Sequence, residues 1–180
     1  MIPESFNNSD IRLYKSTDFP TKWEFQMQLM SGVDAADTMV VKFGDTWFMF
    51  SNICSAGVGD HHAELHVFYS DHFPSNQWQE INGGNPVIFD PQKGRNAGLF
   101  WHKGILYRVN QVHGHAHYGK GFKVNEVIEL SKDRYSENEV SCVYPDFKDG
   151  LVSTHHFSAT PTVAVVDFAR RHRKSIVLKD

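Results

Sequence analysis

The sequence has only two cysteines and no long hydrophobic run. Cys54 and Cys142 lie far apart and form no pair with metal-ligand spacing, so the sequence predicts neither a disulfide framework nor a cysteine metal site. This cysteine usage indicates a reducing compartment, and we expect a cytoplasmic protein. No apolar stretch approaches the roughly 20 residues that cross a bilayer as a helix, and the opening "MIPESFNNSD" lacks the pattern of a signal peptide. The sequence therefore predicts no transmembrane segment.

The chain also has no large excess of charge of either sign. It carries 18 Lys and Arg against 21 Asp and Glu, which gives a net charge of −3. Nucleic-acid binders show a strongly basic patch, so we expect no nucleic-acid partner. The one basic run, "RRHRK" (residues 170–174), is interpreted as a solvated edge. No motif indicates a cofactor, and we expect none.

No segment keeps an apolar period of about 3.6 residues over three turns, which argues against long amphipathic helices. Aromatic residues instead make up 13% of the chain and fall in short alternating runs such as "TWFMFSN" and "LHVFYSD". Glycine, proline, asparagine and aspartate separate these runs, a pattern typical of strands joined by turns. The sequence therefore predicts an all-β fold. We expect Trp101 to belong to its core.

Two elements recur along the chain. "IRLYKSTDFPTKW" (residues 11–23) returns as "LHVFYSDHFPSNQW" (65–78), with a weaker third copy at 127–140. Each copy reads as a strand, a turn and a second strand. Between the copies stands another hairpin, "MVVKFGDTWFMFSN" (39–52), which returns as "GLFWHKGILYRVNQ" (98–111) and, in altered form, as "HFSATPTVAVVDFAR" at the C-terminal end.

Each repeating unit therefore contains two hairpins, or four strands. Four-stranded units that repeat around an axis describe a β-propeller. An immunoglobulin-like sandwich is the alternative, but it does not explain why the two hairpins recur as a pair. We expect a partial propeller domain followed by a C-terminal tail. The expected blades lie near residues 1–30, 31–90 and 91–150, the last strands at 151–170 within a domain of 1–170, and the tail at 171–180.

Several ordered blocks of the chain resemble one protein family. The longest block runs from "MIPESFNNSD" to "TWFMFSN" (residues 1–52), and the blocks "NPVIFDPQKGRNAGLFWHKGILYRVNQ", "YGKGFKVNEVIEL" and "GLVSTHHFSA" follow. Together they resemble the N-terminal domain of glucosamine inositolphosphorylceramide transferases and related bacterial surface-polysaccharide proteins. The resemblance implies a five-bladed propeller like that of glycoside hydrolase family forty-three. This chain would supply about three of the five blades, and the transferase domain would be a separate one.

Connections between the strands of a blade alternate between two faces of a propeller. The tight turns "FGD" (43–45) and "HKG" (102–104) would lie on one face. The longer segments "NICSAGVGDHHA" (52–63) and "QVHGHAHYGKG" (111–121) would lie on the other face as loops, beside the starts of the innermost strands. Long polar loops on a rigid scaffold are the usual place for binding residues.

The loop-rich face supplies the candidate site residues. Asp37 opens an innermost strand and is the candidate catalytic carboxylate, although an ordinary polar strand start is the alternative. The corresponding positions of the next two blades hold Asn96 and either His155 or His156, so no pair of carboxylates is evident. Neutral and cationic groups suit sugar hydroxyls and phosphates, and an aromatic ring can stack on a pyranose. The candidate substrate-binding residues are Arg95, Asn96, Gln111, His113, His115, His117, Tyr118, His155 and His156.

In an extended strand, the alternate residues His113, His115 and His117 would point to one side, as the ligands of a metal site would. Gly114 indicates a flexible loop instead, where alternation loses its meaning. Neither a cysteine pair nor an HExxH motif supports a metal. We therefore predict no metal site.

The predicted function is that of a carbohydrate-active module in surface-polysaccharide or glycolipid biosynthesis. It would bind or process a saccharide, a sugar nucleotide or a glycolipid head group. One alternative is a glycoside hydrolase of the five-bladed type. Another is a non-catalytic scaffold whose exposed strands pair with a second copy or with a chain that supplies the missing blades.

Overall fold

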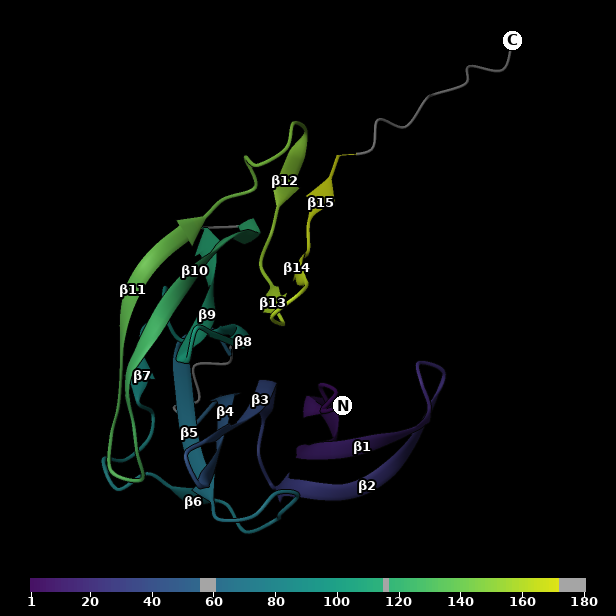
Figure 1. Cartoon of the computed structure of the whole chain (residues 1–180), viewed down its shortest axis with the longest axis vertical. Coiled ribbons are helices and arrows are strands. Elements are labelled where there is room, and N and C mark those ends of the chain that lie inside the picture. Colours follow the sequence, from purple (N-terminus) through teal and green to yellow (C-terminus); the bar gives the residue numbers. More distant parts are fainter. Residues whose placement is uncertain (56–60, 115–116, 172–180) are drawn as a thin grey trace.

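The computed structural model describes residues 1–55, 61–114 and 117–171, and they form antiparallel sheets. The one helical element among these residues is a short 3-10 helix, η1 (Phe6–Asn8), so the all-β prediction is confirmed. The sheets follow one another along an open arc, and the N-terminus lies on the inner side of this arc (Figure 1). The strand pairs β1–β2 and β12–β15 lie at opposite ends of this arc.

The first sheet is a single hairpin. Its strands are β1 (Asp10–Asp18) and β2 (Lys22–Ser31), which pair in antiparallel fashion. The second sheet has the order β3-β4-β5-β6, and β7 also pairs with β5. Its strands are β3 (Ala35–Phe43), β4 (Thr46–Ile53), β5 (Glu64–Ser70), β6 (Gln79–Glu80) and β7 (Ile88–Phe89).

The third sheet has four antiparallel strands in the order β11-β10-β9-β8. They are β8 (Asn96–His102), β9 (Ile105–Gly114), β10 (His117–Leu130) and β11 (Tyr135–Val143). The C-terminal end forms two short pairs, β12 with β15 and β13 with β14. These strands are β12 (Leu151–Ser153), β13 (Phe157–Ala159), β14 (Ala164–Val166) and β15 (Ala169–Arg170).

The recurring Phe-Pro-Trp signature folds the same way in its first two copies. The indole N–H of Trp23 donates to the carbonyl of Pro20 at 2.9 Å, and the indole N–H of Trp78 donates to that of Ser75 at 2.9 Å. In each copy a tryptophan thus closes the turn between an alternating strand and the next strand. The repeat found in the sequence is therefore a repeat of local structure.

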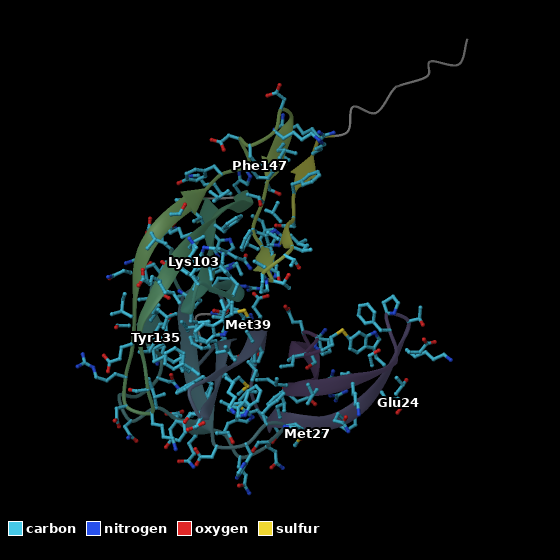
Figure 2. All side chains as sticks on the ribbon, in the orientation of Figure 1. Glu24, Met27, Met39, Lys103, Tyr135 and Phe147 are labelled. Carbon is cyan, nitrogen blue, oxygen red and sulfur yellow. The ribbon has the colours of Figure 1, made fainter. Side chains whose placement is uncertain are left out.

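Side chains of alternating direction build the core between successive sheets. On β4, Phe48 and Phe50 pack with Leu65 of β5 and Leu106 of β9, toward the third sheet. Met49, between them, packs on the other side with residues of the first sheet. A strand that is buried on both faces has apolar residues at successive positions, and "TWFMF" shows this pattern. The side chains fill the space between the sheets, with Met39 toward the middle of the arc and Tyr135 on its outer side (Figure 2).

Trp101 does not belong to the core, contrary to expectation. Its side chain is 42% exposed and stacks on Phe43, with ring centroids 5.7 Å apart. It stands next to the tight turn that follows β8, at the end of the strand away from the core. Near a hairpin turn the neighbouring sheet no longer covers the strand, so the second face of Trp101 stays open to solvent.

The strands β3, β8 and β13 lie on the inner side of the arc and are here called the innermost strands (Figure 1). They approach each other closely, because β8 contacts both β3 and β13. Gly98 makes the second contact possible. A Cβ at this position would lie 2.0 Å from the carbonyl oxygen of Phe157 in β13, and the backbone φ of +147° is a glycine conformation. The absence of a side chain therefore lets the C-terminal hairpin dock on the third sheet.

Candidate functional site

Each innermost strand is interrupted near its start. In β3 the register shifts between Ala36 and Met39, and Asp37 between them has a φ of 47°. In β8 the register shifts between Asn96 and Gly98. In the C-terminal hairpin, residues 154–156 separate β12 from β13. A bulge redirects side chains that regular pairing would hold in place, and Asp is among the few residues that adopt a positive φ readily.

The interrupted segments meet at one cavity of about 170 Å³. Three residues of the predicted site, Asp37, Asn96 and His156, line it together. Glu4 lines it as well and was missed by the sequence analysis, because no motif connects "MIPES" to the innermost strands. The lining residues are Ile2, Glu4, Asp37, Thr38, Met39, Asn96, Ala97 and His156.

Asp37 and Arg95 form an ion pair across the two neighbouring sheets. The Nε–H of Arg95 donates to Oδ2 of Asp37. The side chain of Asp37 is 26% exposed and that of Arg95 is 13% exposed. The structure thus joins two predicted site residues that are 58 positions apart in the chain. The ion pair orients the carboxylate and compensates its charge beside the cavity.

Asn96 and Gln111 form the wall behind this ion pair. Asn96 is buried, its amide donates to the carbonyl of Asp37 at 3.0 Å, and its backbone N–H donates to Oδ1 of Asn52 at 2.8 Å. Gln111 is buried too, and its amide donates to the carbonyl of Asn96 at 3.0 Å. These amides hold the starts of β3 and β8 together, so they fix the shape of the cavity.

Arg108 supports the same wall from β9 and was not singled out by the sequence. It is fully buried, and its guanidinium binds both carboxylate oxygens of Glu137, at 2.7 and 2.6 Å. It also donates to Oδ1 of Asn96 at 3.2 Å and to the carbonyl of Lys93 at 2.8 Å. Burial alone would lower the pKa of Arg108, but the charge and hydrogen bonds of Glu137 raise it above its ordinary value.

Four aromatic rings, here called the ring cluster, run alongside the cavity: His62, His113, Tyr118 and His155. Neighbouring centroids are 4.0 Å apart for His62 and His113, 5.7 Å for His113 and Tyr118, and 4.9 Å for Tyr118 and His155. The ring cluster joins segments from the second, third and C-terminal sheets. Three of its members belong to the predicted site.

Tyr118 connects the ring cluster to the cavity electrostatically. Partial burial is the main cause that raises the pKa of Tyr118, and the negative charges of Asp37, Glu4 and Asp167 add to this effect, while Arg95 opposes it. The phenol therefore lies within the field of the residues around the cavity. Its side chain is nevertheless 58% exposed.

His155 is oriented by Asp167. Its Nδ1 lies against Oδ2 of Asp167, and Oδ1 of Asp167 accepts the backbone N–H groups of His155 at 2.9 Å and His156 at 2.7 Å. Partial burial alone would raise the pKa of Asp167, but these N–H groups and the two imidazoles lower it below its usual value. Asp167 was not predicted, because a carboxylate 12 residues from its histidine has no recognisable spacing.

The first 156 residues match the family model described as glucosamine inositolphosphorylceramide transferase 1, N-terminal. The chain belongs to this family. The resemblance predicted from the sequence blocks is therefore confirmed. The match contains every predicted site residue, whereas Asp167 lies beyond it.

Two members of the family show how much of the whole protein is shared. Glucosamine inositolphosphorylceramide transferase 1 of Oryza sativa subsp. japonica is 29% identical over 167 residues, which is 88% of this chain and 22% of the rice protein. The Arabidopsis thaliana protein of the same name is 30% identical over 165 residues, 87% of this chain and 21% of its own length. The chain thus spans about a fifth of the length of these relatives.

The histidine-rich segment of this family member is less of a loop than expected. Strand β9 continues to Gly114 and β10 begins at His117, so the expected loop over residues 111–121 is wrong for most of its length. Val112 pairs with Gly121 and Gly114 with His117, which extends the ladder of hydrogen bonds. A register shift between His117 and Gly121 takes up the irregularity.

The three alternate histidines do not form one set. His113 joins the ring cluster, whereas the imidazole of His117 is exposed and its Nε2 donates to the carbonyl of Val152 at 2.9 Å. His115 lies outside the described residues. Within the described residues, no three His, Cys, Asp or Glu side chains gather as a metal site. Over the same part of the chain, no helix is both long and apolar enough to cross a membrane.

Proposed function

We propose that this chain binds a saccharide of glycolipid or glycan biosynthesis in the cavity beside Asp37. The family relationship supports the class of ligand, because the relatives are named as glucosamine inositolphosphorylceramide transferases. The observation that carries the proposal is the convergence of Asp37 from β3, Asn96 from β8 and His156 from the segment before β13 on one cavity. The volume of about 170 Å³ is below the range of drug-sized pockets, which suits a single sugar unit.

The charges around the cavity favour a sugar that carries an amine. Arg95 already compensates Asp37. Glu4 lines the same cavity, is exposed, and makes no ion pair or side-chain hydrogen bond among the described residues. Its carboxylate can therefore accept hydrogen bonds from an ammonium group, while Asp37 and His156 serve the hydroxyl groups. Glucosamine combines both kinds of group.

Titration calorimetry with D-glucosamine, D-glucose and N-acetyl-D-glucosamine tests this proposal. D-glucosamine should bind most tightly, because it is the one sugar of the three that carries a charged amine. Glu4→Gln should weaken D-glucosamine about tenfold and bring it close to D-glucose, and Asp37→Asn should weaken all three sugars. His102→Ala, which changes an exposed residue at the opposite end of β8, is the matched control. Absence of heat with every sugar would overturn the proposal.

A glycoside hydrolase is the second candidate, because Glu4 and Asp37 bring two carboxylates to the same cavity. Hydrolysis of a glycosidic bond uses two carboxyl groups, one as the acid and the other as the base or nucleophile. The bond between Arg95 and Asp37 favours binding over this chemistry, since it occupies one oxygen of the second carboxylate. Release of p-nitrophenol from aryl glycosides, abolished by both Glu4→Gln and Asp37→Asn, would establish the hydrolase.

We also propose that the sheets are blades of a β-propeller. The support is the order in which they follow one another along the arc (Figure 1), with β8 in contact with β3 on one side and β13 on the other. In such an arrangement the cavity beside Asp37 would lie on the axis, where the starts of the innermost strands converge.

A further inference from the structure

We infer that the saccharide site continues from the cavity onto Tyr118 and His155, so that the ligand is a glycan of at least two sugar rings. This inference rests on the proposed saccharide function and deepens it. The first ring would occupy the cavity beside Asp37. The second ring would lie with its apolar face on Tyr118 and donate a hydroxyl group to Nε2 of His155.

Tyr118 has the properties of a stacking platform. Its ring is 58% exposed, yet His113 and His155 border it at centroid distances of 5.7 and 4.9 Å. Its backbone is tied as well, because the carbonyl of the next residue, Gly119, accepts the N–H of Thr154 at 2.9 Å. An exposed aromatic ring that is already ordered loses little entropy when a ligand covers it.

His155 is prepared to accept a hydrogen bond. Oδ2 of Asp167 lies against Nδ1, so a neutral imidazole with its proton on Nδ1 would face this carboxylate and leave Nε2 as the acceptor. Thr154 secures the carboxylate's own segment by donating its hydroxyl to the carbonyl of Asp167 at 2.7 Å. Asp167 is thus a positioning residue, and His155 is the group that would touch the sugar.

The cavity and the Tyr118 platform are connected by two consecutive residues. His156 lines the cavity, whereas the preceding residue, His155, contacts Tyr118. The charges of Asp37, Glu4 and Arg95 also act on the pKa of Tyr118, which supports the same placement. The proposed ligand therefore places one sugar ring in the cavity and the next ring on the platform.

The test compares D-glucosamine with the β-1,4-linked glucosamine disaccharide by titration calorimetry. The wild-type chain should bind the disaccharide about tenfold more tightly, a gain typical of one stacked ring and one hydrogen bond. Tyr118→Ala should abolish this gain, so that its affinities for the two sugars become equal, whereas Tyr118→Phe should keep most of the gain. Tyr144→Ala, which removes another exposed tyrosine ring, is the matched control and should bind both sugars as the wild type does.

Asp167→Asn tests the positioning of His155. An asparagine amide can donate to Nδ1, which would place the imidazole proton on Nε2 and remove the acceptor. The ratio of disaccharide to monosaccharide affinity should therefore fall, while a general loss of structure would weaken both sugars alike. Equal wild-type affinity for the two sugars would overturn this inference and leave the proposed function standing. Failure of the wild type to bind either sugar would overturn both.

Discussion

Gly98 is required by the approach of two strands rather than by a turn. Its backbone lies against the carbonyl of Phe157, and any side chain would meet that oxygen. Gly104, in contrast, follows Lys103 in the tight turn after β8, where both residues have positive φ and the space beyond the glycine is open. Gly98 is thus required mainly by close packing, whereas Gly104 is required by its backbone conformation alone.

Gly98→Ala should lower the free energy of unfolding by about 2–4 kcal/mol, because it combines a steric clash with an unfavourable φ. Gly104→Ala should cost only about 1 kcal/mol, since it has the unfavourable φ without the clash. Urea unfolding of both variants measures the difference. Equal losses would show that β8 and β13 do not depend on this contact.

The depressed pKa of Asp167 links its contacts to acid stability. The folded protein holds this carboxylate charged below its ordinary pKa of about 3.9, so its contribution is present above that pH and disappears as the pH falls through the folded value. Asp167→Asn should therefore lose less stability than the wild type when the pH is lowered from about 5 to about 2. Unfolding curves at several pH values check this, and parallel losses in the two proteins would refute it.

At the level of elements, the hairpins were predictable and their lengths were not. Gly44 and Gly104 mark tight turns because few other residues accept positive φ, and a turn residue is a local signal. The extension of β9 and β10 through the histidine-rich segment depends on pairing between Val112 and Gly121, which no local spacing reveals. The bulge at Asp37 has the same origin in strand pairing.

Arg108 shows how one buried charge ties three strands and a loop together. Arg108→Met should destabilise the protein by about 3–5 kcal/mol, because it leaves the carboxylate of Glu137 buried without its cation. The double variant Arg108→Met with Glu137→Gln should recover part of this loss, since no unpaired charge remains. Denaturant unfolding of the single and double variants forms the cycle, and strictly additive losses would argue against the coupling.

At the level of the whole molecule, a single strand pair stands at each end of the arc (Figure 1). In the sequence repeat, the hairpin β1–β2 corresponds to the segment of β5 and β6, and residues 156–170 correspond to the hairpins β3–β4 and β8–β9. Met1 covers part of the edge of β1, because its backbone pairs with that of Tyr14 at 2.8 and 2.9 Å. On β14, Val165 is 60% exposed. Self-association through the edge of β14, which pairs with β13 alone among the described strands, stays a prediction.

Light scattering coupled to gel filtration should accordingly detect dimers whose fraction grows with concentration. Val165→Lys should shift the population toward monomers, because it places a charge on the pairing surface. Ile128→Lys, at an exposed position within the complete third sheet, should leave the dimer fraction unchanged. A monomer at every concentration would rule out this mode of association.

The sequence by itself determined the strand content, the recurring hairpins and the family, because alternation and turn chemistry act over a few neighbouring residues. It also placed Asp37, Asn96 and His156 on one face, and the structure brings them to one cavity, while their roles stay predictions. Only the tertiary structure added Glu4 to that cavity and paired Arg108 with Glu137. These contacts join residues on different strands, and the register and packing of the sheets decide which distant side chains meet.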